Sequence, residues 1–471
     1  MEGVRIEIQL PTSTAKGARP FSVKELVNVY PESATNAQER SKFQLKNAIG
    51  LAPFVTFSRT GSCRGMIEAK DTFFTIYGNT LYEVNSSGSS IRGTIPGTGH
   101  VPMAYSSSEL AIAADNSGYI FNITTNTLTK ITDAAFLPPR DVTFIDGYFV
   151  WLANNSTGNG QVVFTSNLYD GLSYDALDRI ATQRAPDNNV AIDHAYSEVW
   201  VFGSETIEFL ANVGAASPPF APVGNTVLEI GCASTASVVK VPNEGILWLG
   251  NDRLIYQRGR NGLQDVTPHE IANEIATYSR VNDVVAWYYS QGKHKFYVIS
   301  FPAAEKTFVY DIFEQAWHSR ETHGENYWRG QYSAKLGQVT YIGDAFDNVL
   351  FIGNSDTHTD GAVVIRKEFT TPEIHAEDKA ISLTRLEFHV RTGDGAYTGN
   401  DTIRLYASED HGRTFQKLGE QPFAIRGNGR QRVIFNHCGR YDSGVVLKVQ
   451  TAVQSPFEVL AAYADIEVLD A

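Results

Sequence analysis

The sequence predicts an all-β protein: a six- or seven-bladed β-propeller with an N-terminal arm and a C-terminal β-sandwich-like domain. Three observations lead to this prediction. The chain has 471 residues, too many for one ordinary compact core, and a propeller accommodates such length by radial repetition. Aromatic residues make up 11% of the chain, which is ample for burial, and 39 glycines mark frequent turns between short strands. One unit, made of a strand, a tight turn and a strand, recurs along the chain.

The recurring unit joins two apolar, partly aromatic strands through a turn of Gly, Asn or Asp, residues that tolerate positive φ. Seven copies follow one another at roughly 30–55 residues, which is typical of one four-stranded blade per repeat. Two copies could share a blade, so the count gives six or seven blades. A β-sandwich or a pair of barrels is the alternative. The copies span residues 73–84, 110–123, 143–152, 198–210, 246–257, 284–301 and 339–352.

The chain divides into three parts. Residues 1–50 contain three prolines, mixed charges and no hairpin signal, which predicts an arm that leads into the first strand. Residues 51–365 contain the seven repeated units and are expected to form the propeller. In residues 366–471 the strands alternate apolar and polar side chains, the pattern of a half-exposed antiparallel sheet. This last part is predicted to be a separate sandwich-like domain, or else to complete the last blade.

One helix is predicted. Thr267-Pro268-His269-Glu270 has the pattern of a capping box with proline at the first helical position. The apolar residues that follow fall on one face as far as about Ser279. We expect this helix to pack on the outside of the propeller.

The charge is acidic, with a net value of −13, which argues against a protein that grips nucleic acid through its phosphates. Residues 1–50 are an exception, with seven basic and five acidic residues. The three cysteines are far apart and form no CxxC motif, which suits a reducing compartment and leaves room for at most one disulfide. No apolar run is long enough for a signal peptide or a membrane span, so synthesis and assembly in a cytoplasm are expected.

The sharpest local motif resembles the Asp-box hairpin turn of sialidase propellers. In that family the box is structural: its aspartate accepts hydrogen bonds from backbone N–H groups and its aromatic residue packs beneath the turn. We therefore predict a structural turn here and no catalytic role. The motif residues are Ser408, Asp410, Gly412, Thr414 and Phe415.

No arrangement of residues indicates an enzyme. The sequence has no HExxH, P-loop or GxSxG motif and no recognisable pair of carboxylates, so no catalytic, cofactor-binding or metal-ligating residue is predicted. Arg426, Arg430 and Arg432 form a basic hairpin tip, interpreted as a solvated turn or as a contact to an acidic partner or to passing DNA.

The end of the arm carries a second candidate contact. Lys42 and Lys46 lie beside the apolar Phe43 and Leu45, which suits a contact to a neighbouring subunit or to an adaptor. The alternative is that the arm closes the propeller as an edge strand.

An ordered series of segments is more specific than any single motif. It consists of NVYPE (28–32), GSCRG (61–65), IYGNTLY (76–82), DGYFVW (146–151), NLYDGLSYDALD (167–178), APDNNV (185–190), WVFGSETIE (200–208), EIGCASTASV (229–238), LWLGND (247–252), YD (310–311) and WHSR (317–320). This series resembles the packaged-DNA stabilisation family, the tail hub or nozzle of short-tailed phages, over roughly residues 25–355. The last hundred or so residues resemble that family only loosely.

The resemblance implies structural work in a virion. Members of the family form a ring, usually a hexamer, below the portal and the head-to-tail adaptor protein. The ring extends the channel for double-stranded DNA, helps to retain packaged DNA, and receives the tail needle or plug and sometimes the tailspikes. Two other classes remain as alternatives: a sialidase-like propeller that cleaves or binds glycans, and a monomeric binding module.

Overall fold

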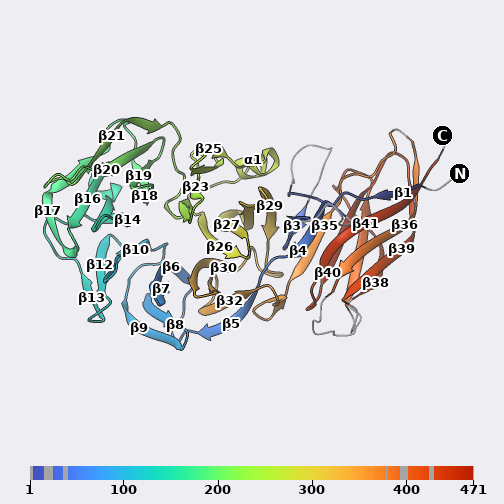
Figure 1. The fold of residues 1–471 in the computed structure, drawn as a ribbon, viewed down its shortest axis with the longest axis horizontal. Coiled ribbons are helices and arrows are strands. Elements are labelled where there is room, and N and C mark those ends of the chain that lie inside the picture. The colour runs from blue at the N-terminus through green and yellow to red at the C-terminus, as the bar shows by residue number, and fades with distance from the viewer. Residues whose placement is uncertain are drawn as a thin grey trace.

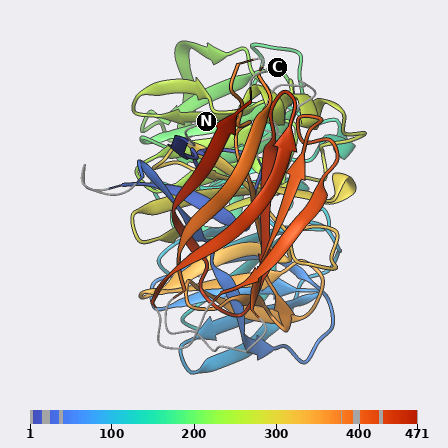
Figure 2. The same cartoon turned by 90° about the vertical axis from the view of Figure 1, so that its right-hand side faces the viewer.

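The computed structural model describes residues 4–14, 25–34, 41–377, 379–392, 401–423 and 429–469. Figure 1 shows two parts side by side along the longest axis, a ring of small sheets and a β-sandwich. Figure 2 views the sandwich end-on, with the strands of its outer sheet crossing in front of the ring.

Seven four-stranded antiparallel units make up the ring, so the predicted propeller is confirmed and the blade count is seven. Blades 1 to 4 are β6–β9 (Cys63–Ala69, Thr72–Tyr77, Thr80–Asn85, Gly88–Thr94), β10–β13 (Met103–Tyr105, Glu109–Ala114, Ser117–Asn122, Thr127–Lys130), β14–β17 (Pro139–Ile145, Tyr148–Ala153, Val162–Asn167, Asp170–Ala181) and β18–β21 (Asn189–Ala195, Glu198–Gly203, Ile207–Asn212, Phe220–Leu228). Blades 5 and 6 are β22–β25 (Val239–Val241, Gly245–Leu249, Ile255–Gly259, Gly262–Asp265) and β26–β29 (Val285–Gln291, His294–Phe301, Lys306–Asp311, Ala316–Arg320). Blade 7 is β30–β32 (Gly330–Leu336, Val339–Asp344, Val349–Asn354) together with β5 (Gly50–Thr56). Three short 3-10 helices, Asn155–Thr157, Thr235–Ser237 and Pro302–Ala304, lie between strands.

The ring is closed by the chain segment that precedes blade 1. Strand β5 pairs antiparallel with β32, from Gly50 opposite Asn354 to Thr56 opposite Val349, and so supplies the fourth strand of blade 7. The innermost strands β6, β10, β14, β18, β22, β26 and β30 contact one another in turn around the ring. Because the last blade is completed by a strand from the other end of the propeller, the first and last blades are held by hydrogen bonds as well as by packing.

Each of the seven repeated units lies in a different blade. Three consecutive blades, 3 to 5, bury a tryptophan in their second strand, namely Trp151, Trp200 and Trp248. These rings fill the space between neighbouring blades, where sheet packs on sheet. The regular spacing of the hairpins therefore reflects one blade per unit.

The single helix of the described residues, α1 (His269–Ala276), lies between blades 5 and 6 and buries Ile271 and Ile275 against both. The predicted capping box does not form. The Thr267 hydroxyl accepts a hydrogen bond from the backbone N–H of Ile255 at 2.5 Å and donates to the carbonyl of that residue at 3.2 Å. Because this hydroxyl is hydrogen-bonded to a strand of blade 5, it does not cap the helix, and the helix starts without a side-chain cap.

The sandwich stacks two sheets around one apolar core that includes Leu386, Phe388, Leu405, Phe435 and Val459. One sheet has the order β3-β4-β41-β36-β39, with β1 paired to β41. The other has the order β35-β40-β37-β38. The bounds are β1 Val4–Glu7, β3 Val29–Ser33, β4 Phe43–Asn47, β35 Arg366–Thr370, β36 Ile381–Arg391, β37 Thr402–Ser408, β38 Gln416–Pro422, β39 Arg430–Tyr441, β40 Val446–Ala452 and β41 Glu458–Val468. The short strands β33 (Thr359–Asp360) and β34 (Val363–Val364) extend the sheet of blade 7.

The N-terminal residues are built into the sandwich, which corrects the expectation of an arm without hairpins. Strands β3 and β4 form a hairpin whose β4 pairs with β41, and β1 runs along the same strand. Strand β2 (Leu26–Val27) pairs with β29 of blade 6 on one side and with β35 of the sandwich on the other. Blade 6 therefore continues into the sandwich as one nine-stranded sheet. The hairpin left no local signal because the two strands are separated by a long connection without a Gly-Asn or Asp-Gly turn.

Candidate functional site

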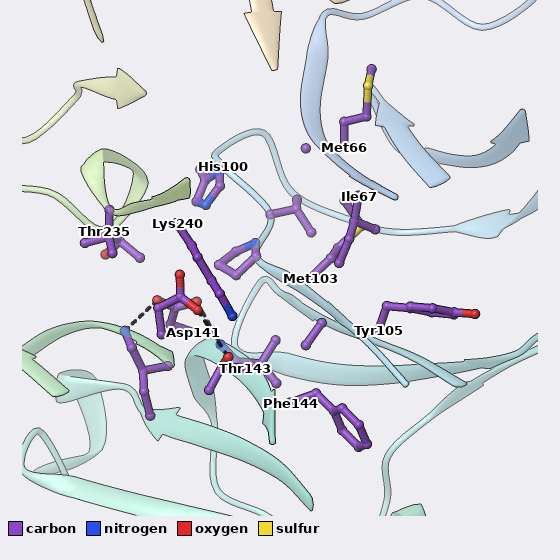
Figure 3. Close-up of a pocket in the computed structure, with 18 of the residues that line it drawn as sticks. Met66, Ile67, His100, Met103, Tyr105, Asp141, Thr143, Phe144, Thr235 and Lys240 are labelled. Atoms are coloured by element: carbon purple, nitrogen blue, oxygen red, sulfur yellow. Dashed lines mark hydrogen bonds between the residues drawn. The ribbon is translucent and has the colours of Figure 1, made fainter. Parts of the chain in front are cut away.

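The axis of the propeller holds a cavity of about 420 Å³. Its wall is formed by the innermost strands of several blades and by the loop before β10. Figure 3 shows the Lys240 side chain reaching across this cavity toward Asp141 and Thr143, with His100 and Thr235 from other blades around it. A propeller axis is where convergent side chains from many blades meet, so this cavity is the first place to look for a site.

The innermost strands of blades 1, 3, 4 and 7 share one irregularity. Each has a β-bulge near its start, whose extra residue is Arg64, Arg140, Val190 or Tyr332. Arg64 is 5% exposed, and its guanidinium donates to four backbone carbonyls, among them those of Gly78 and Gly99 at 2.8 Å. Two of the other bulge residues bond outside their own blade: Arg140 donates to the carbonyl of Asn189 in blade 4 at 3.2 Å, and the hydroxyl of Tyr332 bonds to His100 in the loop before β10.

A chain of polar groups crosses from blade 5 to blade 3. The ammonium of Lys240 lies 2.7 Å from Nε2 of His194, and Nδ1 of His194 lies 2.7 Å from the hydroxyl of Thr143. Because an ammonium can only donate, Nε2 accepts and Nδ1–H donates to Thr143, whose hydroxyl donates to Asp193 at 3.4 Å. Burial lowers the pKa of His194 below its usual value, which favours this neutral form.

Two further groups at the axis are held near neutrality by burial. Asp141 accepts hydrogen bonds from the backbone N–H groups of Val142 at 2.8 Å and Ile192 at 2.9 Å, yet burial raises its pKa to about 7. Burial lowers the pKa of His100 to about 4, and its Nδ1 lies 2.6 Å from the hydroxyl of Tyr332. The cavity therefore holds buried titratable groups together with the ammonium of Lys240 and several apolar side chains. It is far too small for a DNA duplex.

Among the residues that the structure describes, no group of three or more His, Cys, Asp and Glu side chains is placed to hold a metal ion. The three cysteines are buried free thiols. No helix of the described chain combines the length and the apolar character that a membrane span requires.

The Asp-box motif lies in the sandwich, at the turn between β37 and β38. Oδ1 of Asp410 accepts hydrogen bonds from the backbone N–H groups of Arg413 at 3.0 Å and Thr414 at 2.8 Å, and Oδ2 accepts from the Thr414 hydroxyl at 2.7 Å. Ser408 donates to Asp410 and accepts from the N–H of Gly412, which has a φ of 89°. These bonds hold the pKa of Asp410 well below its usual value. Phe415 lies half-buried beneath the turn, under the ammonium of Lys448.

The basic tip is divided between described and undescribed residues. Arg430 and Arg432 are exposed on β39, whereas Arg426 lies outside the described residues. The guanidinium of Arg432 lies 3.7 Å from the carboxylate of Glu387. Arg430 and Arg432 therefore belong to the outer face of the sandwich, far from the propeller axis.

The candidate assembly contacts at the end of the predicted arm do not share one surface, which is a second correction. Leu45 has no exposed surface and belongs to the sandwich core, so it is not available to a partner. Lys46 forms an ion pair with Glu32 on the facing strand β3. Phe43 is half-buried and Lys42 is exposed. The alternation of these residues marks a strand with one face in the core.

Sequence reasoning missed the residues that join the two parts of the molecule. Asn28 is fully buried and has a φ of 59°. It lies between blade 6 and the sandwich, where its side-chain amide hydrogen-bonds to backbone groups of Glu321 and Arg366. Its presence in the NVYPE segment was the one available signal, because asparagine tolerates positive φ where other polar residues are strained.

Two family models match the chain in succession. The model described as bacteriophage P22 Gp10, β-propeller, matches residues 8–358. The model described as bacteriophage P22 Gp10, β-sandwich, matches residues 366–467. A search of curated proteins finds no significant match.

The solved structures that are similar to this chain have low sequence identity to it and low TM-scores. The β-propeller domain of Cps50 (Swd1) from Myceliophteria thermophila has a TM-score of 0.41 and 7% identity, with 64% of this chain and 99% of that chain covered. The N-terminal domain of Nup159 has a TM-score of 0.40 and 10% identity, with coverages of 71% and 99%. The extracellular domain of a hybrid two component system from B. thetaiotaomicron has a TM-score of 0.43 and 8% identity, and this chain spans only 43% of its length.

Proposed function

This chain belongs to the bacteriophage P22 Gp10 family, and from that premise we propose that it is the tail hub, or nozzle, of a short-tailed phage. The observation that carries the proposal is the succession of both family domains, propeller and sandwich, in one chain. A P22 Gp10-type structural protein is a virion component. In the proposed role, six copies form a ring below the portal and the head-to-tail adaptor, after assembly in the host cytoplasm.

The proposed ring extends the DNA channel and helps to retain packaged DNA. A duplex does not fit the axial cavity of about 420 Å³, so the DNA would pass between copies and not through a propeller. The net charge of −13 suits a wall along which DNA slides, because a strongly basic wall would hold the phosphates. The far end of the ring would dock the tail needle or plug, and the tailspikes where a phage has them.

We propose no catalytic activity. The polar chain from Lys240 to Asp193 has its middle histidine held neutral between two partners, and Asp141, the other acid of this cavity, accepts hydrogen bonds from two backbone N–H groups. The Asp box, the feature that suggested a sialidase-like propeller, lies in the sandwich and uses its carboxylate to close a turn. Turnover of a panel of sialosides and other glycosides that is abolished by Asp141→Asn or Asp193→Asn would contradict this part of the proposal.

The central experiment is assembly on the adaptor. The purified chain is mixed with the ring of portal and adaptor from the same phage, and the mass of the complex is measured by native mass spectrometry. We expect a discrete complex with six added copies. The portal ring without adaptor is the control and should add none. A chain that does not join the adaptor ring, or that joins it without a fixed stoichiometry, would refute the hub assignment.

A further inference from the structure

The outer face of strands β36 and β39 carries a ladder of arginines. The basic residues of these two strands, histidines apart, are Arg385, Arg391, Arg430, Arg432 and Arg440, and Glu387 is their one acidic residue. Arg391 lies directly opposite Arg430, and His389 lies opposite Arg432. Like charges in directly opposite positions destabilise a sheet, and here Glu458 of β41 compensates Arg391 at 3.4 Å but no carboxylate of the described residues pairs with Arg430.

The carboxylate of Glu387 contacts two arginines of this ladder, Arg385 and Arg432. The side chain of Glu387 is 3% exposed and receives Arg5 at 3.2 Å, Arg385 at 2.9 Å and His389 at 2.7 Å, with Arg432 at 3.7 Å. Burial raises the pKa of Glu387, but the hydrogen bonds from His389 and Arg5 lower it below its usual value. Arg5 also lies 3.9 Å from Asp465, and Arg440 lies 3.7 Å from Asp442, so most of these arginines have a carboxylate partner within the chain. Within the described residues, the side chain of Arg430 makes no hydrogen bond or ion pair, although its backbone lies in the sheet opposite Arg391.

A groove of about 480 Å³ lies beside the ladder. It is lined by His389, Arg430, Gln431 and Arg432, by the half-buried side chains of Ile434 and Leu460, and by Val390, whose own side chain is buried in the sandwich core. Leu460 is the extra residue of a bulge in β41, opposite His389 and Val390. This arginine groove, defined by these seven residues, combines a basic rim with the apolar side chains of Ile434 and Leu460, so its complement is an acidic surface that also presents apolar side chains.

Blades 3 and 4 present such a surface at the opposite end of the molecule. Residues 139–228 contain ten acidic and three basic residues, a net charge of −7, and seven of the acidic residues remain outside the buried class when Asp141, Asp178 and Glu208 are set aside. Tyr169 is 72% exposed and Val213 is 57% exposed in hairpin turns of these two blades. Tyr169 has a φ of 55°, a conformation that bulky residues rarely adopt. An exposed, strained aromatic side chain favours a contact outside the chain over a role in folding.

These turns form one continuous surface. The ring of Tyr169 and the side chain of Leu168 lie against Gly147, since a Cβ there would come within 3.0 Å of both. The neighbouring Asp146 accepts a hydrogen bond from Asn212, the residue before Val213, at 3.2 Å. We call Asp146, Leu168, Tyr169, Asp170 and Val213 the acidic turns. In Figure 1 their blades lie at one end of the long axis and β39 at the other.

We propose that the arginine groove of one copy receives the acidic turns of a second copy of this chain. Guanidinium groups bind carboxylates in a bidentate manner, and the apolar side chains of the turns have matching walls in the groove. Because the two surfaces differ, the contact is heterologous and leaves one free surface of each kind, so that it repeats until a ring closes. The contact between two copies does not depend on the proposed function; only the closure of repeated contacts into a ring rests on it.

A polyanion such as DNA is the competing occupant. Phosphates would use the arginines, but they would leave the half-buried Ile434 and Leu460 without a partner. The acidic turns would also remain unexplained. The charge complementarity within one chain therefore favours a second copy, and DNA binding becomes an outcome of the test.

The test uses two variants of the full chain. The groove variant carries Arg430→Glu and Arg432→Glu, and the turn variant carries Tyr169→Gly and Asp170→Lys. Sedimentation velocity at physiological ionic strength should show wild type associating as its concentration rises, and each variant alone as a monomer. An equimolar mixture should form a dimer and nothing larger, because only one intact pair of surfaces remains. The matched controls, Lys70→Glu with Lys130→Glu and Asp71→Lys with Ile91→Ser, change exposed residues of blades 1 and 2 and should associate like wild type.

Several results would overturn the inference. These are a wild type that stays monomeric at every concentration, a variant that associates like wild type, and a mixture that forms no dimer. If the groove variant loses binding to a labelled random DNA duplex while its self-association is unchanged, the groove belongs to a polyanion. Arg430→Glu alone, at a position without ion-pair partners, replaces the groove variant if the double variant has a lower melting temperature. Failure to join an adaptor ring with normal self-association would refute the proposed function and not this contact.

Discussion

The side chain of Asn28 holds the backbone of Glu321 as a neighbouring strand would. Its Oδ1 accepts from the N–H of Glu321 at 3.1 Å and its Nδ2 donates to the carbonyl of the same residue at 3.1 Å. A second bond from Nδ2 reaches the carbonyl of Arg366 at 2.7 Å. The buried side-chain amide of Asn28, which lies between β2 and β3, therefore connects the end of blade 6 with the start of the sandwich.

Asn28→Gly should weaken this junction. Glycine adopts the φ of 59° without strain, so the variant isolates the loss of the three side-chain hydrogen bonds. Their backbone partners would be left without these bonds at the junction, and we expect the free energy of unfolding to fall by roughly 2–4 kcal/mol. Asn28→Ala should lose about 1 kcal/mol more, since alanine is strained at positive φ. Denaturant unfolding measures both, and hydrogen exchange at Glu321 locates the effect. Equal stability of Asn28→Gly and wild type would show that the side-chain bonds contribute nothing net.

Asp410→Ala should destabilise the turn between β37 and β38. The hydrogen bonds that lower the pKa of Asp410 are made to its charged form, so their contribution is present above the unfolded pKa of about 3.9 and is lost as the pH falls below it. At pH 7 the melting temperature of the variant should be lower and hydrogen exchange of β37 and β38 faster. Near pH 3 the difference from wild type should shrink. Asp442→Ala, also an exposed aspartate in a sandwich turn, is the control and should have a smaller effect at pH 7.

The fold was predictable where its signals are local. Each blade contains one hairpin with a turn of Gly, Asn or Asp, and counting hairpins counts blades. The pairing of β5 with β32 joins Gly50 to Asn354 and has no local signature, so the ring closure could not be read from the sequence. The same holds for Thr267: its sequence context is that of a capping residue, but a strand of blade 5 uses the hydroxyl first.

The candidate sites, too, were predictable where their residues are close in sequence and unpredictable where the fold brings distant residues together. The Asp-box pattern is a local hydrogen-bonding unit, and its bonds were readable from eight consecutive residues. The polar chain at the propeller axis joins residues from three blades, so only the closed ring brings Lys240 to His194. Leu45 was misread because burial depends on which sheet covers a strand, and the covering strands come from the other end of the chain.

Leu45→Ala should act on folding and not on assembly. Leu45 is completely buried in the sandwich core, so removal of its side chain leaves a cavity and should cost roughly 2–5 kcal/mol of stability. Lys42→Glu, at an exposed position of the same segment, should leave the melting temperature unchanged. Thermal unfolding and mixing with adaptor rings separate the two effects. A folded Lys42→Glu variant that no longer joins the rings would establish Lys42 as an assembly contact, whereas a Leu45→Ala variant with wild-type stability would contradict its place in the core.

The pH dependence of stability should carry a signature of Asp141. Its pKa is raised to about 7 in the folded protein, compared with about 3.9 when unfolded. The folded state therefore binds a proton that the unfolded state has released, and the stabilisation from this group is complete below about pH 4 and is lost as the pH rises toward 7. Asp141→Asn cannot titrate and keeps one acceptor oxygen for the N–H groups of Val142 and Ile192. Relative to wild type, the variant should gain stability as the pH rises from 4 to 7, by at most about 4 kcal/mol for a shift of three pKa units.

The comparison must be made as a difference, because other groups titrate in the same range with the opposite sign. Burial lowers the pKa of His100 and of His358 to about 4 in each case, so both contribute stability that increases as the pH rises from 4 toward 6.5. These terms cancel when Asp141→Asn is subtracted from wild type at each pH. Urea unfolding at several pH values between 4 and 8 gives the difference. A difference that does not change with pH would mean that Asp141 is ionised throughout, with the two backbone N–H groups and the nearby Arg140 outweighing its burial.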